Sequence, residues 1–405
     1  MSTTTSPTEI CRQLDTPGDL GSAFDELLAT RQEPPSLLAH GEPTHGIAAF
    51  PLLRNELLCH LVERGYRSIV LETDVLAASV VDNYVGGGAT EIDDVLERGF
   101  SHGFGRVPGN RELVEWLRGY NTGRPARDRV RFYGFDAPVE FSGAPSPRHA
   151  LSVVLEYLPA ALHPDSAGDV DGLLGDDADW TNPDAMRDPA ASIGDSERAR
   201  ALRLVADDLV SVLRRAAPVL APTDPVAYDD ALAYAHTARG LLRYHAAMAH
   251  TASDRIATLL GLRAAMMAEN LLAIVSKEKG RGPSLVFAHN AHLQQMQSSM
   301  PDGDEGAIWP SAGALVGFAL GERYMFVAAD AGPHPRPGTL QGTLAEATAR
   351  RALFPAKPLH AALPRSLGTG EPIVRGHIPL SPADVERADA IVFVADTDGH
   401  QHQYW

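Results

Sequence analysis

Two short polar motifs hold the side chains of this chain that are best suited to acid–base chemistry. The motif Gly-Glu-Pro-Thr-His-Gly places the carboxylate of Glu42 three residues before the imidazole of His45, and the motif His-Asn-Ala-His places the imidazoles of His289 and His292 at the same spacing. Imidazole titrates near neutral pH, and an adjacent carboxylate orients the ring and stabilises its charged form. These residues predict a site in which a histidine such as His45 takes a proton from water.

Both motifs directly follow apolar runs that we interpret as buried strands, Leu37–Ala39 and Leu285–Phe287. Two further predicted strands end on carboxylates, Glu72 and Asp136. In open α/β sheets, ligands bind outside the carboxyl ends of the strands. A single polar residue at a strand end is more often a structural hydrogen-bonding group, but four strand ends that all carry titratable groups favour a functional site.

The residue types leave two chemistries open. In the first, His45 activates water, and a second histidine or Arg54, two turns into the helix predicted after His45, stabilises an oxyanion. In the second, Glu42, His45, His289 and His292 are ligands of a first-row metal ion. Spacing alone does not separate the two. The chain has no Gly-x-Ser-x-Gly nucleophile elbow, no phosphate-binding P-loop, no His-Glu-x-x-His and no paired Cys-x-x-Cys motif.

Composition limits the classes of partner. The chain has 405 residues, of which 44% are hydrophobic, and a net charge of −17, which argues against nucleic acid and anionic membranes. Two cysteines are too few for a disulfide framework, the N-terminal residues do not resemble a signal peptide, and no apolar run approaches the roughly 20 residues of a membrane span. We expect a soluble cytoplasmic protein whose partner is an apolar small-molecule substrate, which the acidic balance also allows to be cationic.

Apolar periodicity predicts an α/β fold with a central, mostly parallel sheet flanked by helices. We expect an N-terminal segment over residues 1–35, a catalytic core over residues 36–140 and 280–405, and a helical insertion over residues 141–279 that caps the carboxyl ends of the strands. The expected strands are Leu37–His40, Ser68–Glu72, Val130–Asp136, Ser284–Ala288, Ala314–Leu320, Tyr324–Ala329 and Ala390–Ala395. The expected long helices of the insertion are His149–Leu158, Asp195–Ala216, Pro225–Ala249 and Ser253–Lys277.

Within the insertion, residues 165–192 are rich in Gly, Asp and Pro. This composition predicts a mobile surface loop between two of the long helices. Such a loop could act as a lid over a substrate.

The order of the motifs resembles that of the erythromycin esterase family, whose members include macrolide esterases and relatives linked to succinoglycan biosynthesis. The family pattern has a Gly-Glu-x-x-His-Gly loop, a helix with an arginine, an apolar strand ending in Glu, a Tyr-Gly-Phe-Asp segment, an Arg-x-x-x-Met-Ala-Glu-Asn helix and a His-Asn-Ala-His segment. The matching residues here are Gly41–Gly46, Arg54, Ile69–Glu72, Tyr133–Asp136, Arg263–Asn270 and His289–His292.

The resemblance implies a hydrolase that opens a macrocyclic lactone with water and without a covalent serine intermediate. It implies that His45 is the general base, with Glu42, Glu72, His289 and Arg54 as the other catalytic residues, and we expect neither a metal ion nor a cofactor. The residues expected to bind the substrate are His292, Asp136, Asn290, Arg263 and Glu269.

Three functions follow from these observations. The first is an esterase of this type, acting on an ester or lactone of a macrocyclic or other small natural product. The second is a tailoring enzyme of natural-product biosynthesis that closes, opens or dehydrates a ring with the same histidine and glutamate site. The third is a protein without turnover that uses the histidines to bind a ligand, haem or metal.

Overall fold

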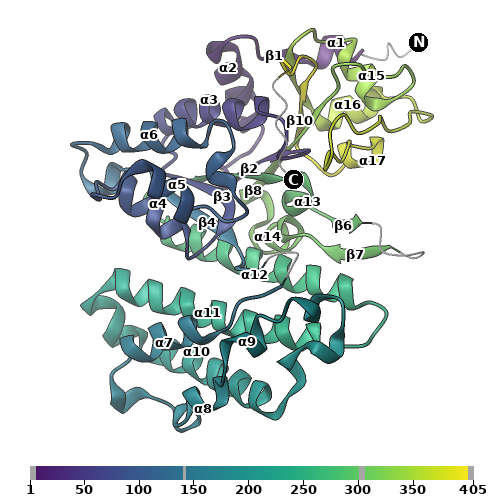
Figure 1. The fold of residues 1–405 in the computed structure, drawn as a ribbon. Coiled ribbons are helices and arrows are strands. Elements are labelled where there is room, and N and C mark those ends of the chain that lie inside the picture. The colour runs from purple at the N-terminus through teal and green to yellow at the C-terminus, as the bar shows by residue number, and fades with distance from the viewer. Residues whose placement is uncertain (1–5, 140–142, 301–305, 400–405) are drawn as a thin grey trace. The chain divides into compact units, whose positions relative to one another are not determined.

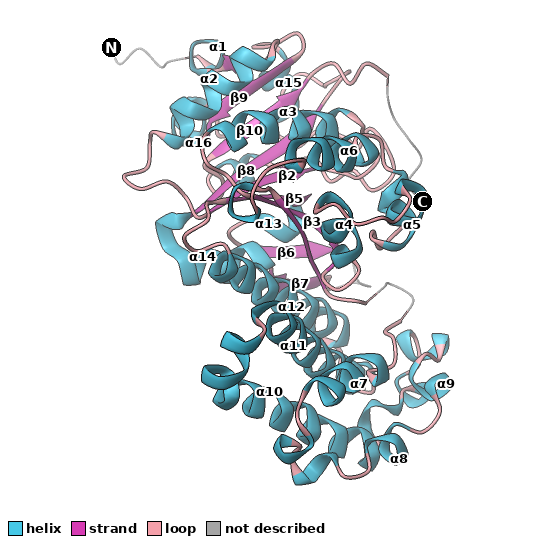
Figure 2. Cartoon of the chain, turned by 90° about the vertical axis from the view of Figure 1, so that its left-hand side faces the viewer, coloured by secondary structure: helices cyan, strands magenta, loops and turns pink. Residues whose placement is uncertain are grey.

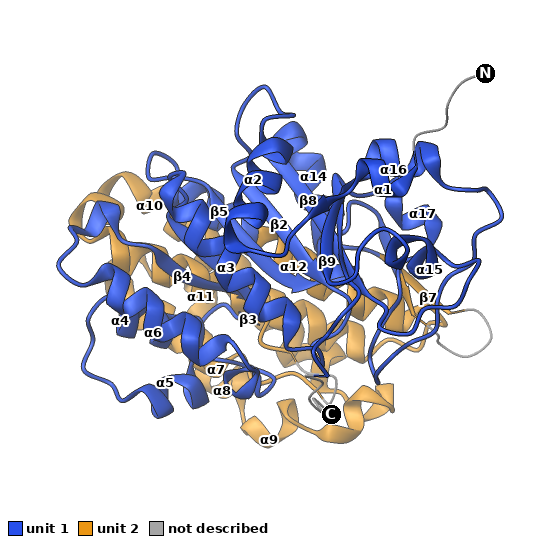
Figure 3. Ribbon diagram, turned by 90° about the horizontal axis from the view of Figure 1, so that it is seen from above, with its two compact units in different colours: residues 1–135, 271–298, 310–405 blue, residues 136–270, 299–309 orange. Residues whose placement is uncertain are grey.

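The computed structural model describes residues 6–139, 143–300 and 306–399. They divide into two compact units, coloured blue and orange in Figure 3. Unit 1 comprises residues 1–135, 271–298 and 310–405, and unit 2 comprises residues 136–270 and 299–309. One boundary falls inside the long helix α12 (Arg255–Lys277). That the helical insertion caps the strand ends stays a prediction.

Unit 1 is built on an eight-stranded mixed sheet, seen as the magenta arrows of Figure 2. The predicted α/β class with a mostly parallel sheet flanked by helices is confirmed: β10, β8, β2, β5 and β3 pair in parallel, and β9 pairs antiparallel with β10 and β1. In sheet order the strands are β1 (Arg12–Gln13), β9 (Arg351–Pro355), β10 (Ala390–Val394), β8 (Tyr324–Ala331), β2 (Leu37–Glu42), β5 (Ser284–His289), β3 (Ser68–Asp74) and β4 (Arg131–Asp136).

The strand order reverses direction around β2 and β5. After β2 the chain continues to β3 and β4 on one side of β5, whereas after β5 it continues to β8 and β10 on the other side of β2. Ligands of open α/β sheets bind outside the carboxyl ends of the strands at such a switch point. The two polar motifs begin in the last residues of β2 and β5, so the topology places both of them at this point.

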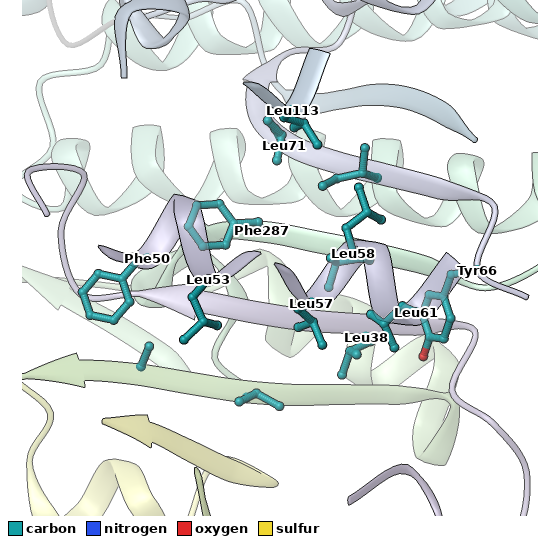
Figure 4. Close-up of a cluster of buried hydrophobic side chains, with 14 of the residues drawn as sticks. Leu38, Phe50, Leu53, Leu57, Leu58, Leu61, Tyr66, Leu71, Leu113 and Phe287 are labelled. Atoms are coloured by element: carbon teal, nitrogen blue, oxygen red, sulfur yellow. The ribbon is translucent and has the colours of Figure 1, made fainter. Parts of the chain in front are cut away.

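Helix α3 (Ala49–Glu63) covers one face of the sheet and anchors the loop that carries His45. Its Leu53, Leu57 and Leu61 are fully buried together with Leu38 of β2 (Figure 4), and each buried leucine contributes roughly 1.5–3 kcal/mol. The helix ends where Gly65 adopts a positive φ and Tyr66 N–H bonds back to a carbonyl of the last turn, a conformation that favours glycine.

The remaining α-helices of unit 1 are short and lie around the sheet, as Figure 1 shows. They are α1 (Pro7–Ile10), α2 (Pro17–Leu28), α4 (Ala78–Val85), α5 (Ile92–Arg98), α6 (Asn110–Asn121), α13 (Asn290–Leu293), α14 (Ala312–Leu320), α15 (Leu340–Ala345), α16 (Ala356–Ala362) and α17 (Pro382–Val385). A separate two-stranded sheet pairs β6 (Gln297–Met300) with β7 (Ala307–Pro310).

One predicted strand is wrong, and the strands β1, β6, β7 and β9 were missed. Residues 314–320 belong to helix α14, because the hydroxyl of Ser311 accepts the N–H of Ala314 and caps a helix there. A short, uniformly apolar run has no periodicity that separates strand from helix. Among the missed strands, β9 belongs to the main sheet, and its Arg351 forms an ion pair with Glu56 of α3, a contact that apolar patterning does not reveal.

Unit 2 consists mainly of helices, and its four predicted long helices are present. These are α7 (Arg148–Tyr157), α10 (Glu197–Thr223), α11 (Pro225–Met248) and the part of α12 up to Asn270. A core of buried side chains joins α7, α10 and α11, with Leu151, Leu209 and Leu242 at most 1% exposed. The apolar spacing of these segments was therefore a sufficient signal for their helices.

Residues 165–192, predicted to be a mobile surface loop, contain short helices and a buried side chain, and a role as a lid stays a prediction. Trp180 is 1% exposed and donates its indole N–H to Leu174 O, and Asp169, Asp176 and Asp188 each cap a short turn by accepting a main-chain N–H. Aspartate and proline favour the first residues of helices as well as loops. The segment holds α8 (Val170–Leu174), α9 (Asp177–Trp180) and 3₁₀ turns at Asp165–Ala167, Pro183–Met186 and Pro189–Ala191.

Helix α12 is the one helix in the described part of the chain that is long and apolar enough to cross a membrane, judged by length and composition alone. The sequence analysis did not identify this helix as a possible membrane span, because Arg263 and Glu269 interrupt its apolar residues. Core helices of soluble proteins have the same composition, and Leu259, Ala264 and Leu271 are buried. The helix is thus weak evidence for a membrane.

A buried histidine in β2 makes the fold sensitive to acid. His40 is fully buried, with its ring edge-on to Phe24 and Phe287. Burial lowers the pKa of His40 from 6.5 to about 4. Between these values the unfolded chain binds the extra proton, so the free energy of unfolding falls as the pH drops from 6.5 towards 4.

We predict that His40→Leu flattens this dependence. The slope of the free energy of unfolding between pH 4.5 and 6 should decrease by up to about 1.4 kcal/mol per pH unit, the value for one proton. Urea unfolding at several pH values measures the slope, and His334→Leu is the comparison for removing an exposed histidine. Identical slopes for wild type and His40→Leu would contradict the prediction.

Candidate active site

Glu42 and His45 form a close, partly buried pair at the end of β2. Glu42 Oε1 lies 2.6 Å from His45 Nδ1, and the side chains are 7% and 14% exposed. When Glu42 is ionised, Nδ1–H donates to it, and Nε2 becomes the nitrogen that can take a proton. Nε2 lies 3.9 Å from Glu72 Oε1, which is too long for a direct hydrogen bond. Burial raises the pKa of Glu42, while the hydrogen bond to His45 opposes that shift.

Glu72, near the end of β3, is held by both histidines of the second motif. Its Oε2 accepts the main-chain N–H of His289 at 2.8 Å, and its Oε1 lies 3.1 Å from His292 Nε2. The register of β2 and β5 places Glu42 opposite His289. Strands β2, β5 and β3 therefore bring Glu42, His45, Glu72, His289 and His292 together, as the strand-end pattern suggested.

His289 is fixed as a neutral imidazole by two main-chain groups. Its Nε2 lies 2.9 Å from Pro43 O and its Nδ1 accepts the N–H of Ala291 at 3.1 Å. A carbonyl only accepts and an amide N–H only donates, so Nε2 carries the proton. Burial also lowers the pKa of His289 to about 3. With both nitrogens engaged, His289 is placed to hold the loop between Glu42 and His45 and not to transfer protons.

Arg54 reaches the same region but binds protein groups. Its guanidinium donates to Asn110 Oδ1 at 2.9 Å and to Asn55 Oδ1 at 2.7 Å, and it lies over the ring of Phe287. Burial lowers the pKa of Arg54 to about 9, with Glu42 opposing the shift. Since that value is above neutral pH, Arg54 remains a positive charge near Glu42.

Phe104 and Asn110 are site residues that the sequence did not indicate. The ring centroid of Phe104 lies 4.7 Å from that of His45, and Asn110 Nδ2 donates to Phe104 O at 2.8 Å. Asn110 thus links Arg54 to the residue that packs against His45. The one available signal was the run of glycines between Gly99 and Gly109, which is common in loops of many kinds.

A small cavity lies beside the Glu42–His45 pair, entirely within unit 1. Its volume is about 30 Å³, and a water molecule needs roughly 10–15 Å³ of such space. Polar groups at its wall could hold water, and the apolar ones would exclude bulk solvent. It is lined by Glu42, His45, Glu72, Arg54, Asn110, Pro51, Leu71, Phe100, Phe104, Val107, Phe287 and Ala288.

Asn290 in the second motif and Gly41 in the first have structural roles. The amide of Asn290 bonds to both main-chain groups of Ala329 in β8, at 2.7 and 3.1 Å. A Cβ atom at position 41 would lie only 2.0 Å from Asn290 Oδ1. This close approach requires glycine at position 41. The Asn290 side chain, which we expected to bind the substrate, is thus engaged with the main chain of Ala329.

Of the other predicted substrate-binding residues, His292 lies in the cluster, and Asp136, Arg263 and Glu269 belong to unit 2. There, Arg263 Nε and Nη2 donate to the buried Asp136 carboxylate at 2.9 and 2.5 Å. Glu269 pairs with Arg239 at 3.1 Å, and its side chain is 46% exposed. The first pair has the geometry of a structural ion pair, and contact of these three residues with a substrate stays a prediction.

We predict that the purified protein carries no stoichiometric zinc, iron or manganese. A histidine ligand must offer a ring nitrogen to the metal, and both nitrogens of His289 are bound to main-chain groups. Within the described residues, no three His, Cys, Asp or Glu side chains are arranged to hold a metal ion. Elemental analysis tests this. One metal per chain that is removed together with activity by a chelator would refute it.

Solved structures with this fold include a Bacillus cereus protein that is 16% identical, with a TM-score of 0.69 over 96% of this chain and 95% of that chain. A succinoglycan biosynthesis protein is 14% identical, with a TM-score of 0.64 over 96% and 95% of the two chains. A mutant of the erythromycin esterase EreC in its open conformation is 19% identical, with a TM-score of 0.64 over 92% and 93%. At these identities the likeness establishes the fold.

At the level of sequence, the family model described as Erythromycin esterase matches residues 61–397, well over half of the chain. The match includes Glu72, His289 and His292, and it begins after Glu42 and His45. A comparison with curated proteins found no match.

Proposed function

Because the chain belongs to the erythromycin esterase family, we propose that it is an ester hydrolase in which His45 activates a water molecule for attack on an ester or lactone. The observation that carries this proposal is the 2.6 Å contact between Glu42 and His45 Nδ1, which directs Nε2 towards Glu72. The proposed substrate is an apolar small natural product with a macrocyclic lactone or another ester.

A water molecule between His45 and Glu72 would be the nucleophile. The 3.9 Å between His45 Nε2 and Glu72 Oε1 allows one water to hydrogen-bond to both groups at about 2.8 Å. His45 Nε2 takes one proton from this water as its oxygen attacks the carbonyl carbon. The positive charge that develops on His45 is stabilised by the carboxylates of Glu42 and Glu72.

The second half of the reaction returns that proton. The tetrahedral intermediate collapses when the bond from the carbonyl carbon to the alkoxy oxygen breaks, and the Nε2–H of His45 protonates the departing oxygen. The products are a carboxylic acid and an alcohol, which remain joined when the substrate is a lactone. Water is the sole co-reactant, so the scheme is balanced without a metal ion or a cofactor, and no covalent enzyme intermediate forms.

The direct test is incubation of the purified protein with a panel of macrolide lactones and simple esters, followed by mass spectrometry. Hydrolysis of a lactone adds the mass of one water to the substrate, and ring closure or dehydration removes it. Addition of water that depends on His45 supports the proposal. Loss of water would favour a tailoring enzyme, and tight binding without conversion would favour a binding protein.

A further inference from the structure

We propose that Asp330 and His377 form a second histidine–carboxylate pair that positions the catalytic loop of unit 1, acting through the main chain of Ile378. Both are positioning residues for His45, and neither is placed to touch a substrate. This inference rests on the proposed function for its meaning in catalysis, although the positioning itself can be measured without a substrate.

Asp330, near the end of β8, is a fully buried carboxylate whose neighbours supply N–H donors. Its Oδ1 accepts from Ala331 N at 2.8 Å and lies 2.8 Å from His377 Nε2, and its Oδ2 accepts from Gln341 Nε2 at 2.6 Å and from Leu380 N at 2.9 Å. A buried carboxylate is tolerated when its oxygens are saturated in this way. These four donors therefore require a side chain at position 330 that accepts hydrogen bonds with both of its oxygens.

His377 is locked in one orientation. Its Nδ1 accepts the N–H of Ile373 at 3.0 Å, so the proton lies on Nε2 and is directed to Asp330. The side chains of His377 and Asp330 are 1% and 0% exposed. Since Asp330 binds both His377 and Leu380, it holds the short segment between them at both ends.

Ile378 lies within that segment and bonds to the catalytic loop. Its N–H donates to Pro43 O at 3.0 Å, the same carbonyl that faces His289 Nε2 at 2.9 Å. Pro43 stands between Glu42 and His45 and has no N–H of its own, so this carbonyl is its one main-chain hydrogen-bonding group. Ile378 and His289, which are distant in sequence, thus both hold the carbonyl of Pro43. The position of Pro43 in turn sets the distance between Glu42 and His45.

The test compares Asp330→Asn with a variant of Asp389, a carboxylate outside β8 that bonds to the other end of this strand. Asparagine turns one of the two oxygens into an NH2 group that faces N–H donors, which should release the segment from His377 to Leu380. Asp389 is a half-buried carboxylate, 20% exposed, and it accepts Phe326 N at the start of β8, at 2.8 Å. Asp389→Asn should therefore affect β8 without reaching Pro43.

We expect Asp330→Asn to lower kcat by about 10- to 100-fold with little change in KM, and to shift the acidic limb of the pH–rate profile. Without substrate, the NMR titration of the His45 ring, assigned by its absence in His45→Gln, should move in Asp330→Asn and stay in place in Asp389→Asn. An unmoved His45 titration in folded Asp330→Asn, or equal effects of both variants, would overturn the inference.

Two variants of His377 decide the matter should Asp330→Asn fail to fold. Glutamine can place its amide N–H near the position of Nε2 and keep the bond to Asp330, whereas asparagine is too short for that bond and offers an acceptor near the position of Nδ1. If positioning runs through Asp330, His377→Gln retains more activity and a more native His45 titration than His377→Asn. Greater activity and a more native His45 titration in His377→Asn than in His377→Gln would contradict the inference.

If the wild type hydrolyses no ester, the proposed function fails, and the NMR comparison still tests whether Asp330 positions His45.

Discussion

His45→Gln is expected to lower kcat by about 100- to 10,000-fold, the range observed when a general base is lost. Glutamine preserves much of the shape and polarity of the imidazole but cannot take a proton at neutral pH. The pair it would disrupt is the 2.6 Å contact with Glu42. Because the interaction is needed chiefly in the transition state, KM should change by less than about threefold. Steady-state kinetics on the substrate found by mass spectrometry measure both constants.

The matched control for this variant is His60→Gln. His60 Nε2 lies 2.9 Å from Asp25 Oδ1, and its side chain is 14% exposed, the same fraction as that of His45. This second histidine–carboxylate pair joins α3 to α2 away from the strand ends, so its loss should leave kcat near the wild-type value. If His45→Gln retained a near wild-type kcat while folded, another group would have to be the base.

Glu72→Gln is expected to lower kcat by about 100- to 1,000-fold, a magnitude typical of losing one electrostatic contact in a preorganised site. The carboxylate faces two donors, the main-chain N–H of His289 and the ring of His292. An amide can accept from one of them but presents its own N–H groups to the other. The negative charge that would stabilise protonated His45 is also lost. Kinetics in parallel with His45→Gln give the comparison.

Glu278→Gln controls for the loss of a buried carboxylate. The side chain of Glu278 is 2% exposed and accepts from Tyr133 and Arg281, outside the strand-end cluster. The Glu278→Gln substitution should lower thermal stability and leave kcat per folded molecule unchanged. A Glu72→Gln protein with the kinetics of Glu278→Gln would show that Glu72 is a structural residue.

The sequence by itself determined the α/β class, the long helices of unit 2 and the positions of the polar motifs at strand ends. These properties follow from local rules. Side chains alternate along a strand and recur every 3.6 residues along a helix, and parallel strands share one carboxyl edge. Glu42, His45, Glu72, His289 and His292 could therefore be grouped before any coordinates were known. The same local rules wrongly assigned residues 314–320 to a strand, because this uniformly apolar run shows neither strand nor helix periodicity.

Only the tertiary structure decided what each of those side chains can do. A histidine can be a base, a ligand or a fixed neutral donor, and the choice depends on which atoms face its two nitrogens. For His289 these are Pro43 O and Ala291 N, and for His45 one of them is Glu42. The pairing of Asp330 with His377 and the contact of the Phe104 ring with His45 join residues that are 47 and 59 positions apart. No spacing rule reaches that far, because such contacts are set by how the elements pack.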